Sequence, residues 1–319
     1  MDQKNKKLQL PTFIMPHYCD KEIYIHCMKQ AVEGIQKQSD NEFNLLIIDD
    51  NSPQSFAKDL LKKMRKEDSR IHIIFLHKNH GAGYCRNMGI KWAEKHEAPF
   101  VLFNDSDDIS HPKRLEVTKG IFHDGGFGLL YSTYIPIDEE GKRWDIDKLP
   151  SDICEALELH KNSPPQGENA WVETALKYGY VNLTSSTSIA TKLAIKYLSP
   201  ITRVSEDTHT WYRIMASTDK VIYNNSIPSM YRMPKNSEMG IAAKDRYGKN
   251  YYNEKIKIDL NGFRKAIEIA KNRNKIKPEM EDALIYLFCK RLSDELSRHG
   301  FDRYLSIEKE VYATSIEKQ

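Results

Sequence analysis

Short apolar runs alternate with helical segments along the first half of the chain. Four runs end abruptly in polar residues, as buried parallel strands do. They are Pro11–Met15, Phe43–Ile48, Ile71–Leu76 and Pro99–Phe103. Glu22–Gln38 places apolar side chains three and four residues apart, which indicates a helix with one buried face, and Phe56–Lys66 and Arg86–His96 follow as further predicted helices. This order predicts a doubly wound α/β sheet, and such sheets bind ligands at the carboxyl ends of their strands.

The second half of the chain has a less regular pattern. Gly128–Tyr134 and Val181–Ala190 are typical of strands, and the intervening His160–Glu168 has the Asn, Ser and Pro content of a loop. A helix is expected over Asp207–Ser217. Further on, the chain is highly charged and its apolar positions have helical spacing, so residues 240–319 are predicted to be helical. Those apolar positions are Phe263, Ile267, Ala270, Leu284, Leu287, Phe288 and Leu292.

The composition is that of an ordinary globular protein. Of 319 residues, 40% are hydrophobic and 29% charged, and the net charge is only +3, so we expect no nucleic-acid partner, which would require a clustered basic surface. Five scattered cysteines, odd in number and never in a CxxC pair, argue against a disulfide framework or a zinc knuckle. No run approaches the roughly 20 apolar residues of a transmembrane helix. We therefore expect a cytoplasmic protein, free or in peripheral contact with the inner face of the membrane.

Acidic residues follow two of the predicted strands. Asp49-Asp50-Asn51-Ser52 comes directly after Ile48, and Asp105-Ser106-Asp107-Asp108 comes shortly after Phe103. Crowded carboxylates need a cation or a hydrogen-bond donor such as a nucleobase imide, and a hard divalent ion that also binds substrate phosphates meets that need. Either segment alone is equally consistent with a solvated turn or a helix cap. Two such segments at matching strand ends favour a functional site.

Further motifs accompany these segments in a fixed order. They are Pro16-His17-Tyr18, Ile47 to Ser52, the glycine-rich Asn79 to Gly89, Phe103 to Asp108 with Pro112 and Leu115 after it, and then Ser205-Glu206-Asp207 and Tyr231-Arg232. On these residues the chain resembles family 2 glycosyltransferases, most closely over Thr12–Leu115 and less closely through the first three quarters of its length. The resemblance implies the GT-A fold, a Rossmann-like mixed sheet flanked by helices, with the helical C-terminal region as an appendage.

The resemblance also implies a nucleotide-sugar site. Asp49 matches the position that accepts a hydrogen bond from a uracil imide, with Pro16 and Tyr18 beside the base. Arg86 matches an arginine whose guanidinium suits a base edge or a phosphate. Glycines at positions 81 and 83 allow the turn before it, or simply belong to a loop. The full donor-binding set is Pro16, Tyr18, Asp49, Asn51, Gly83, Arg86, Asp105, Ser106 and Lys235.

Metal binding and catalysis are assigned through the same resemblance. Asp105 and Asp107 form the DxD motif and would bind Mn²⁺ or Mg²⁺, Asp107 as the direct ligand and Asp105 through the ribose or a metal-bound water. Asp207 of the Glu206-Asp207 pair would be the general base that deprotonates the acceptor hydroxyl. A helix cap built by Ser205 or Asp207 is the alternative, and the two roles are compatible.

The sequence departs from the family pattern after Tyr231-Arg232. Many relatives have a histidine there that joins the metal shell, whereas this chain has Pro234 followed by Lys235. A third protein ligand to the metal is therefore in doubt. Lys235 is expected to stabilise the phosphates instead.

Together these features predict an inverting, metal-dependent hexosyltransferase. The expected donor is a UDP-hexose or UDP-N-acetylhexosamine, and the expected acceptor is a glycan or glycolipid of a bacterial surface polysaccharide such as capsule or lipopolysaccharide. Residues 1–239 would form the catalytic domain, with a nucleotide-sugar half at 1–115 and an acceptor half at 116–239. The alternatives are a nucleotidyltransferase, which should have a glycine-rich basic loop after the first strand, and a catalytically inactive binding module with the same fold.

Overall fold

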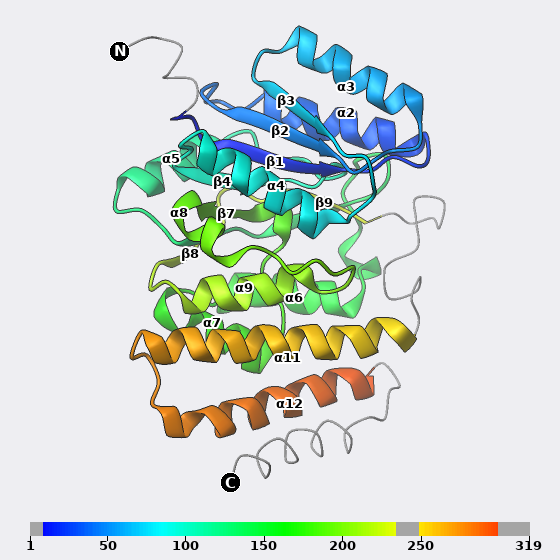
Figure 1. Ribbon diagram of the computed structural model, residues 1–319. Helices are drawn as coiled ribbons and strands as arrows, with labels where there is room; N and C mark the ends of the chain where they lie inside the picture. Colours follow the sequence, from blue (N-terminus) through cyan, green and yellow to red (C-terminus); the bar gives the residue numbers. More distant parts are fainter. Residues whose placement is uncertain (1–8, 234–248, 299–319) are drawn as a thin grey trace.

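The computed structural model describes residues 9–233 and 249–298. Its centre is a seven-stranded mixed sheet in the order β3-β2-β1-β4-β7-β5-β8, with helices on both faces, and a small parallel pair, β6-β9, beside it (Figure 1). Only β7 runs antiparallel to its two neighbours among these described strands. The predicted α/β architecture, a mixed sheet flanked by helices, is confirmed.

The elements follow the rhythm that the sequence predicts. The strands are β1 Thr12–His17, β2 Asn44–Asp49, β3 Ile71–Phe75, β4 Phe100–Phe103, β5 Leu129–Tyr131, β6 Tyr134–Ile137, β7 Thr187–Ala190, β8 Val221–Tyr223 and β9 Ser229–Arg232. The α-helices are α2 Ile23–Gln36, α3 Ser55–Glu67, α4 Ala82–Lys95, α5 Arg114–His123, α6 Ser151–Asn162, α7 Ala170–Glu173, α8 Thr191–Ala194, α9 Glu206–Ala216, α11 Lys249–Asn272 and α12 Glu281–Arg298. All strands predicted in the first half are therefore present.

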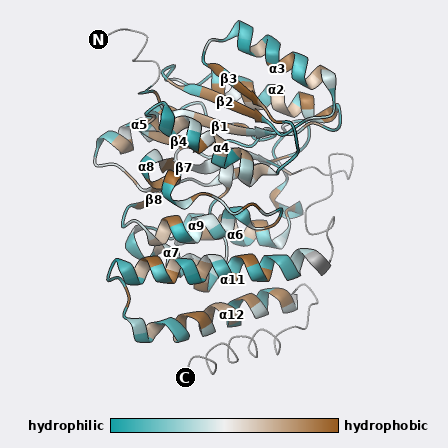
Figure 2. Cartoon of the chain, in the orientation of Figure 1, coloured by the Kyte–Doolittle hydropathy of each residue, from teal (hydrophilic) through white to brown (hydrophobic). Residues whose placement is uncertain are grey.

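Side-chain alternation in the strands builds two hydrophobic layers. Phe13 and Met15 of β1 pack with α2, α3 and α5 on one face, whereas Ile14 packs on the other face with Ile48 of β2 and Ile90 of α4. The period of two along a strand explains this division. Figure 2 shows β2 and β3 as largely hydrophobic and the visible side of α3 as mostly hydrophilic.

The C-terminal helices continue the second of these layers. α11 lies between α9 and α12 (Figure 1), and Phe263 of α11 stacks on Phe288 of α12 with ring centroids 4.5 Å apart. Tyr212 of α9 meets both rings edge-on. Helices α11 and α12 thus share one core with the sheet. None of the helices in the described ranges is long and apolar enough to cross a membrane.

Three predictions about the second half were wrong in part. Within Val181–Ala190 only β7 is a strand, because Ser186 and Thr187 donate their hydroxyls to the carbonyl of Leu183 and so stabilise a tight turn in place of a ladder. The predicted loop from His160 begins inside α6. Leu287 was expected on the buried stripe of α12 but is 46% exposed, because the neighbouring Phe288 takes the inward position.

Candidate functional site

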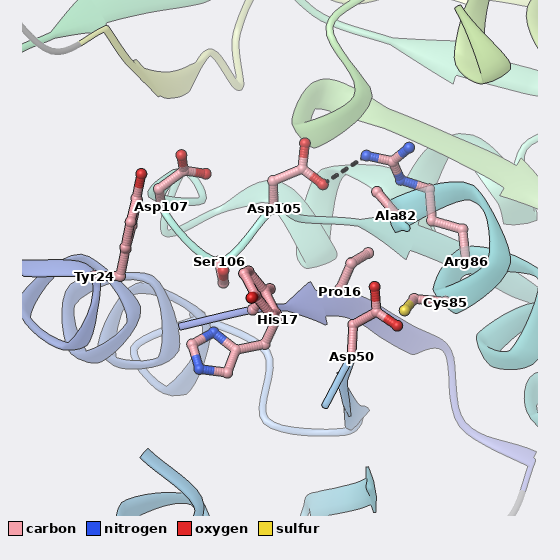
Figure 3. A pocket seen from close by; sticks show the side chains of 11 residues that line it. Pro16, His17, Tyr24, Asp50, Ala82, Cys85, Arg86, Asp105, Ser106 and Asp107 are labelled. Carbon is pink, nitrogen blue, oxygen red and sulfur yellow. Dashed lines mark hydrogen bonds and ion pairs between the residues drawn. The ribbon is translucent and has the colours of Figure 1, made fainter. Parts of the chain in front are cut away.

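A cavity of about 250 Å³ opens at the carboxyl edge of the central sheet. Its walls come from the end of β1, the residue after β2, the first turns of α2 and α4, and the segment after β4. Figure 3 shows these side chains converging from separate elements, with Arg86 paired to Asp105. The lining residues are Pro16, His17, Tyr18, Tyr24, Asp50, Ala82, Cys85, Arg86, Asp105, Ser106 and Asp107. Six of them were predicted as site residues from the sequence, namely Pro16, Tyr18, Arg86, Asp105, Ser106 and Asp107.

The acidic segment after β4 is held by the backbone around it. Asn104 donates its side-chain amide to the backbone carbonyls of Asp105 and Asp108, both at 2.9 Å. The amide of Asp105 donates to the hydroxyl of Ser185 at 2.9 Å, and Arg232 donates its amide to the Asp108 carboxylate at 2.8 Å. These bonds leave the carboxylates of Asp105 and Asp107 facing the cavity. Burial and the nearby charge of Asp105 raise the pKa of Asp107 to about 6.

The two aspartates after β2 have different surroundings. Asp49 is fully buried and accepts hydrogen bonds from the amide and hydroxyl of Ser52, so it closes a turn and does not line the cavity. Asp50 does line it, and its carboxylate accepts the amides of His80 and Gly81, each at 2.7 Å. Of these two aspartates, Asp50 lines the cavity, whereas Asp49, the residue that the sequence indicates, does not.

Arg86 joins the two acidic parts of the site. Its guanidinium donates to Asp105 at 2.8 Å and to Glu206 at 3.1 Å, and the residue is only 6% exposed. Burial alone would lower its pKa, but Asp105 and Glu206 together hold the pKa above its ordinary value. The arginine is thus a permanent cation between the DxD segment and the start of α9.

Gly83 allows the start of α9 to approach α4. A Cβ at this position would lie 2.8 Å from the Glu206 Cγ, a distance that real Cβ atoms essentially never show. Gly83 does not line the cavity, so its observed role is this close approach. Its predicted contact with the donor remains a prediction.

The Glu206-Asp207 pair lies in the first turn of α9. Ser205 precedes it in the left-handed conformation, with φ +57°, which is costly for a non-glycine residue. Its hydroxyl does not cap the helix, whereas the Asp207 carboxylate accepts the amide of Thr208 at 2.7 Å. Burial, followed by the charge of Asp207, raises the pKa of Glu206. Asp207 lies outside the cavity wall but adjoins it through Glu206 and Arg86.

One further predicted residue, Asn51, does not line the cavity. Asn51 has φ +61° and turns the chain after β2. Lys235 lies outside the described residues. The structure adds His17, which stood in the Pro16-His17-Tyr18 motif without an assigned role, and Tyr24, for which the sequence carried no motif. Burial lowers the pKa of His17 to about 4 despite the attraction of Asp49. The sequence did carry a signal for Asp50. A Ser three residues after an Asp commonly closes a turn with it, so Ser52 is expected to occupy the carboxylate of Asp49 and to leave Asp50 as the aspartate that faces the site.

No group of three or more His, Cys, Asp or Glu side chains within residues 9–233 and 249–298 is arranged to hold a metal ion by itself. The DxD segment nevertheless offers two carboxylates to the cavity, from Asp105 and Asp107. Such a pair can hold a hard cation together with substrate oxygens.

Comparison with known proteins agrees with the resemblance seen in the sequence. A family model described as Glycosyl transferase family 2 matches residues 12–176, just over half of the chain. An uncharacterized glycosyltransferase of Methanocaldococcus jannaschii is 32% identical over 133 residues, which cover 41% of this chain and 44% of that protein. The Escherichia coli UDP-Glc:alpha-D-GlcNAc-diphosphoundecaprenol beta-1,3-glucosyltransferase WfgD is 28% identical over 125 residues, 39% of this chain and 46% of its own length. The chain thus spans less than half of each relative.

Solved structures resemble the chain over nearly all of its length. Residues 1–349 of Staphylococcus aureus TarS in complex with UDP align with a TM-score of 0.53 and 15% identity, covering 92% of both chains. At this identity the likeness concerns the fold. It extends past the end of the family match at residue 176 and so includes much of the second half of the chain.

Proposed function

The chain belongs to glycosyltransferase family 2, and from that premise we propose that it moves a hexose or N-acetylhexosamine from a UDP-sugar to a hydroxyl of a glycan acceptor. One observation carries the proposal: Arg86 connects the carboxylate-lined cavity at the strand ends with the Glu206-Asp207 pair on α9. A donor site and a candidate base therefore adjoin one another. A cation between them suits a reaction in which a diphosphate leaves.

The donor nucleotide is proposed to enter between β1 and the turn before α4. Pro16, Tyr18 and Asp50 line this side of the cavity. We assign recognition of the base to Asp50 rather than Asp49, because the Asp49 carboxylate is buried against Ser52. The carboxylate of Asp50 keeps lone pairs for an imide donor beyond the two backbone amides that it accepts.

Asp105 and Asp107 fit a divalent cation, Mn²⁺ or Mg²⁺. Both offer oxygen ligands, which such ions prefer, and both lie on the cavity wall where a diphosphate would complete the coordination. When bound, the cation supplies positive charge that neutralises the departing diphosphate. Lys235 remains a proposed further contact to the phosphates.

Transfer is proposed as a single displacement with inversion. Asp207 accepts the proton of the acceptor hydroxyl as that oxygen bonds to the anomeric carbon. The bond from this carbon to the diphosphate breaks at the same time, and the nucleotide leaves with the electron pair. Arg86 holds a fixed positive charge beside this step, since Asp105 and Glu206 keep it ionised.

The acceptor is proposed to be a growing surface glycan on a lipid carrier. WfgD, a relative over 39% of this chain, is described by its name as acting on a diphosphoundecaprenol acceptor. Residues 116–239 would bind this acceptor and residues 1–115 the nucleotide sugar. Such an acceptor would place the protein at the cytoplasmic face of a membrane. Residues 1–239 are proposed as the catalytic domain, with residues 240–319 as a helical C-terminal region appended to it.

The first experiment is a donor panel with a binding arm. Calorimetry with UDP, GDP, dTDP and CMP, in Mn²⁺ or in chelator, should show metal-dependent binding of UDP. Release of UDP from one UDP-sugar should then be slow, metal-dependent and lost in Asp107→Ala. Asp59→Ala is the matched control, because Asp59 is an exposed carboxylate paired with Lys62 on α3, away from the cavity.

The outcomes separate the alternatives. Binding of UDP without turnover of any sugar donor, with candidate acceptors present, would indicate an inactive binding module. Absence of nucleotide binding under all conditions would contradict the proposed function altogether.

A further inference from the structure

A chain of polar contacts centred on a buried carboxylate links the C-terminal helices to the start of α9. The hydroxyl of Ser205 donates to the Asp259 carboxylate at 2.5 Å. The ammonium of Lys255 lies 2.5 Å from the other oxygen of Asp259 and 3.8 Å from the carboxylate of Glu295 on α12. Asp259 itself is fully buried. The contacts thus run from α12 through α11 to Ser205, the residue that directly precedes Glu206-Asp207.

Ser205 is in a conformation that needs support. Its φ of +57° lies in the left-handed region, which disfavours residues with a side chain. A serine before a helix usually turns its hydroxyl toward the first helical amides, but here the hydroxyl is directed to α11 instead. The bond to Asp259 therefore fixes the backbone at the point where the chain enters α9.

The first turn of α9 is held from the opposite side as well. Arg86, on the sheet side, binds Glu206 at 3.1 Å. On the α11 side the two helices approach closely, since a Cβ on Gly262 would lie 2.8 Å from the Cα of His209. Glu206 and Asp207 are thus set between a cation from α4 and a carboxylate from α11. A small rotation of this turn would move the Asp207 carboxylate.

We propose that Asp259 is a positioning residue for the transfer reaction. By accepting the Ser205 hydroxyl, it holds the left-handed residue and thereby sets the direction of Asp207. The inference rests on the proposed function for the role of Asp207 as general base. It also gives residues 249–298, beyond the part of the chain that the family model matches, a role in catalysis in addition to packing.

The test uses four variants of the full chain. Ser205→Gly removes the hydroxyl and relieves the left-handed strain, Asp259→Ala removes the acceptor, and the double variant combines them. Asp259→Asn keeps an oxygen that can accept the hydroxyl. The matched control is Asn261→Ala, which removes a 3.0 Å hydrogen bond between α11 and His209 one helical turn further into α9.

Transfer kinetics and hydrogen exchange are measured on each variant, together with its melting temperature. Steady-state transfer should show kcat lowered by about 10- to 100-fold in Ser205→Gly and Asp259→Ala, with the donor KM within about twofold. The double variant should be no worse than either single variant, because the two residues act as one unit. Asp259→Asn should recover most of kcat, and Asn261→Ala should resemble the wild type. Hydrogen exchange should be faster at the amides of the first turn of α9 in Ser205→Gly and Asp259→Ala.

Other results would overturn the inference. Unchanged kcat and unchanged exchange in Ser205→Gly would show that the bond does not position the turn. Losses of kcat that simply follow the melting temperature, Asn261→Ala included, would reduce Asp259 to a packing residue. If the wild type transfers no sugar, the proposed function fails. The exchange data then still decide whether Asp259 and Ser205 order the turn before Asp207.

Discussion

The two acidic segments of the site reach their positions by different means. Asp105–Asp108 follows a central strand, and its geometry comes mainly from that strand and from the side chain of Asn104 at its end, with two further bonds to Ser185 and Arg232. Ser205–Asp207 begins a helix, and its geometry comes from Arg86 and Asp259, which lie 120 and 54 residues away in the chain, respectively. A strand end places a carboxylate through the regularity of the sheet. A helix start depends on which distant side chains meet it.

The largest expected effect separates catalysis from binding. Asp207→Asn keeps the shape of the first turn of α9 but removes the proposed base, so kcat for transfer should fall by about 10³-fold. The UDP affinity should be unchanged, because Asp105–Asp108 after β4, the strand-end segment, is intact. Paired kinetics and calorimetry check both statements. An unaltered kcat would remove Asp207 from the mechanism and leave it as a helix cap.

Replacement of Arg86, whose guanidinium joins the two acidic segments, should destabilise both of them. Arg86→Ala leaves Asp105 and Glu206 without their shared partner in a largely buried setting, so we expect the free energy of unfolding to fall by about 3 kcal/mol. Denaturant titration measures this loss. A double variant, Arg86→Ala with Glu206→Gln, should regain part of it, since one uncompensated carboxylate is gone. Failure to regain any stability would show that packing, and not charge, dominates at Arg86.

Asp107 gives the strand-end segment its own pH dependence. Its pKa is about 6, and only the ionised carboxylate can bind a cation, so metal-dependent UDP binding should be about tenfold weaker at pH 5 than at its plateau. Protonation favours the folded state of the apo-protein over the same interval, because the folded pKa lies above the unfolded value near 4. Asp107→Asn should bind UDP weakly and lose this pH dependence. A persistent dependence would assign it to another group.

The smallest effect concerns the contact between α4 and α9. Gly83→Ala would press on Glu206, so we expect kcat to fall about tenfold with a loss of about 1 kcal/mol in stability. Gly120→Ala on α5 is the matched control, since a Cβ there meets nothing within 4 Å. The higher helix propensity of Ala should raise the free energy of unfolding of this variant by at most about 1 kcal/mol. Kinetics and thermal melts compare the two. Equal behaviour would mean that α9 adjusts freely to α4.

The same contrast explains what the sequence could predict. The apolar run through Ile48 identified β2, and the acids after Phe103 identified the strand-end segment, because both follow from local pattern. The local pattern indicated Asp49, whereas only Asp50 lines the cavity, because Ser52 donates its amide and hydroxyl to the Asp49 carboxylate.

Contacts over long distances in the chain carried no local signal. Asp259 is an ordinary charged residue in a helical pattern, and its bond to Ser205 exists only after α11 packs on α9. Tyr24 reaches the cavity because α2 begins beside the end of β1. Thr184–Ser186 form a tight turn because side-chain hydroxyls compete with strand pairing, although the apolar pattern favoured a strand.

The position of β7 has a consequence for how the chain is made. This strand lies between β4 and β5, so the sheet stays open at β4 until residues 187–190 have left the ribosome. An open central edge is prone to pair with other chains during synthesis. A fragment of residues 1–115 would keep that edge permanently, and it should aggregate when expressed alone. The part of the protein that we assign to the nucleotide sugar is therefore inseparable, during biogenesis, from a strand encoded in the acceptor half.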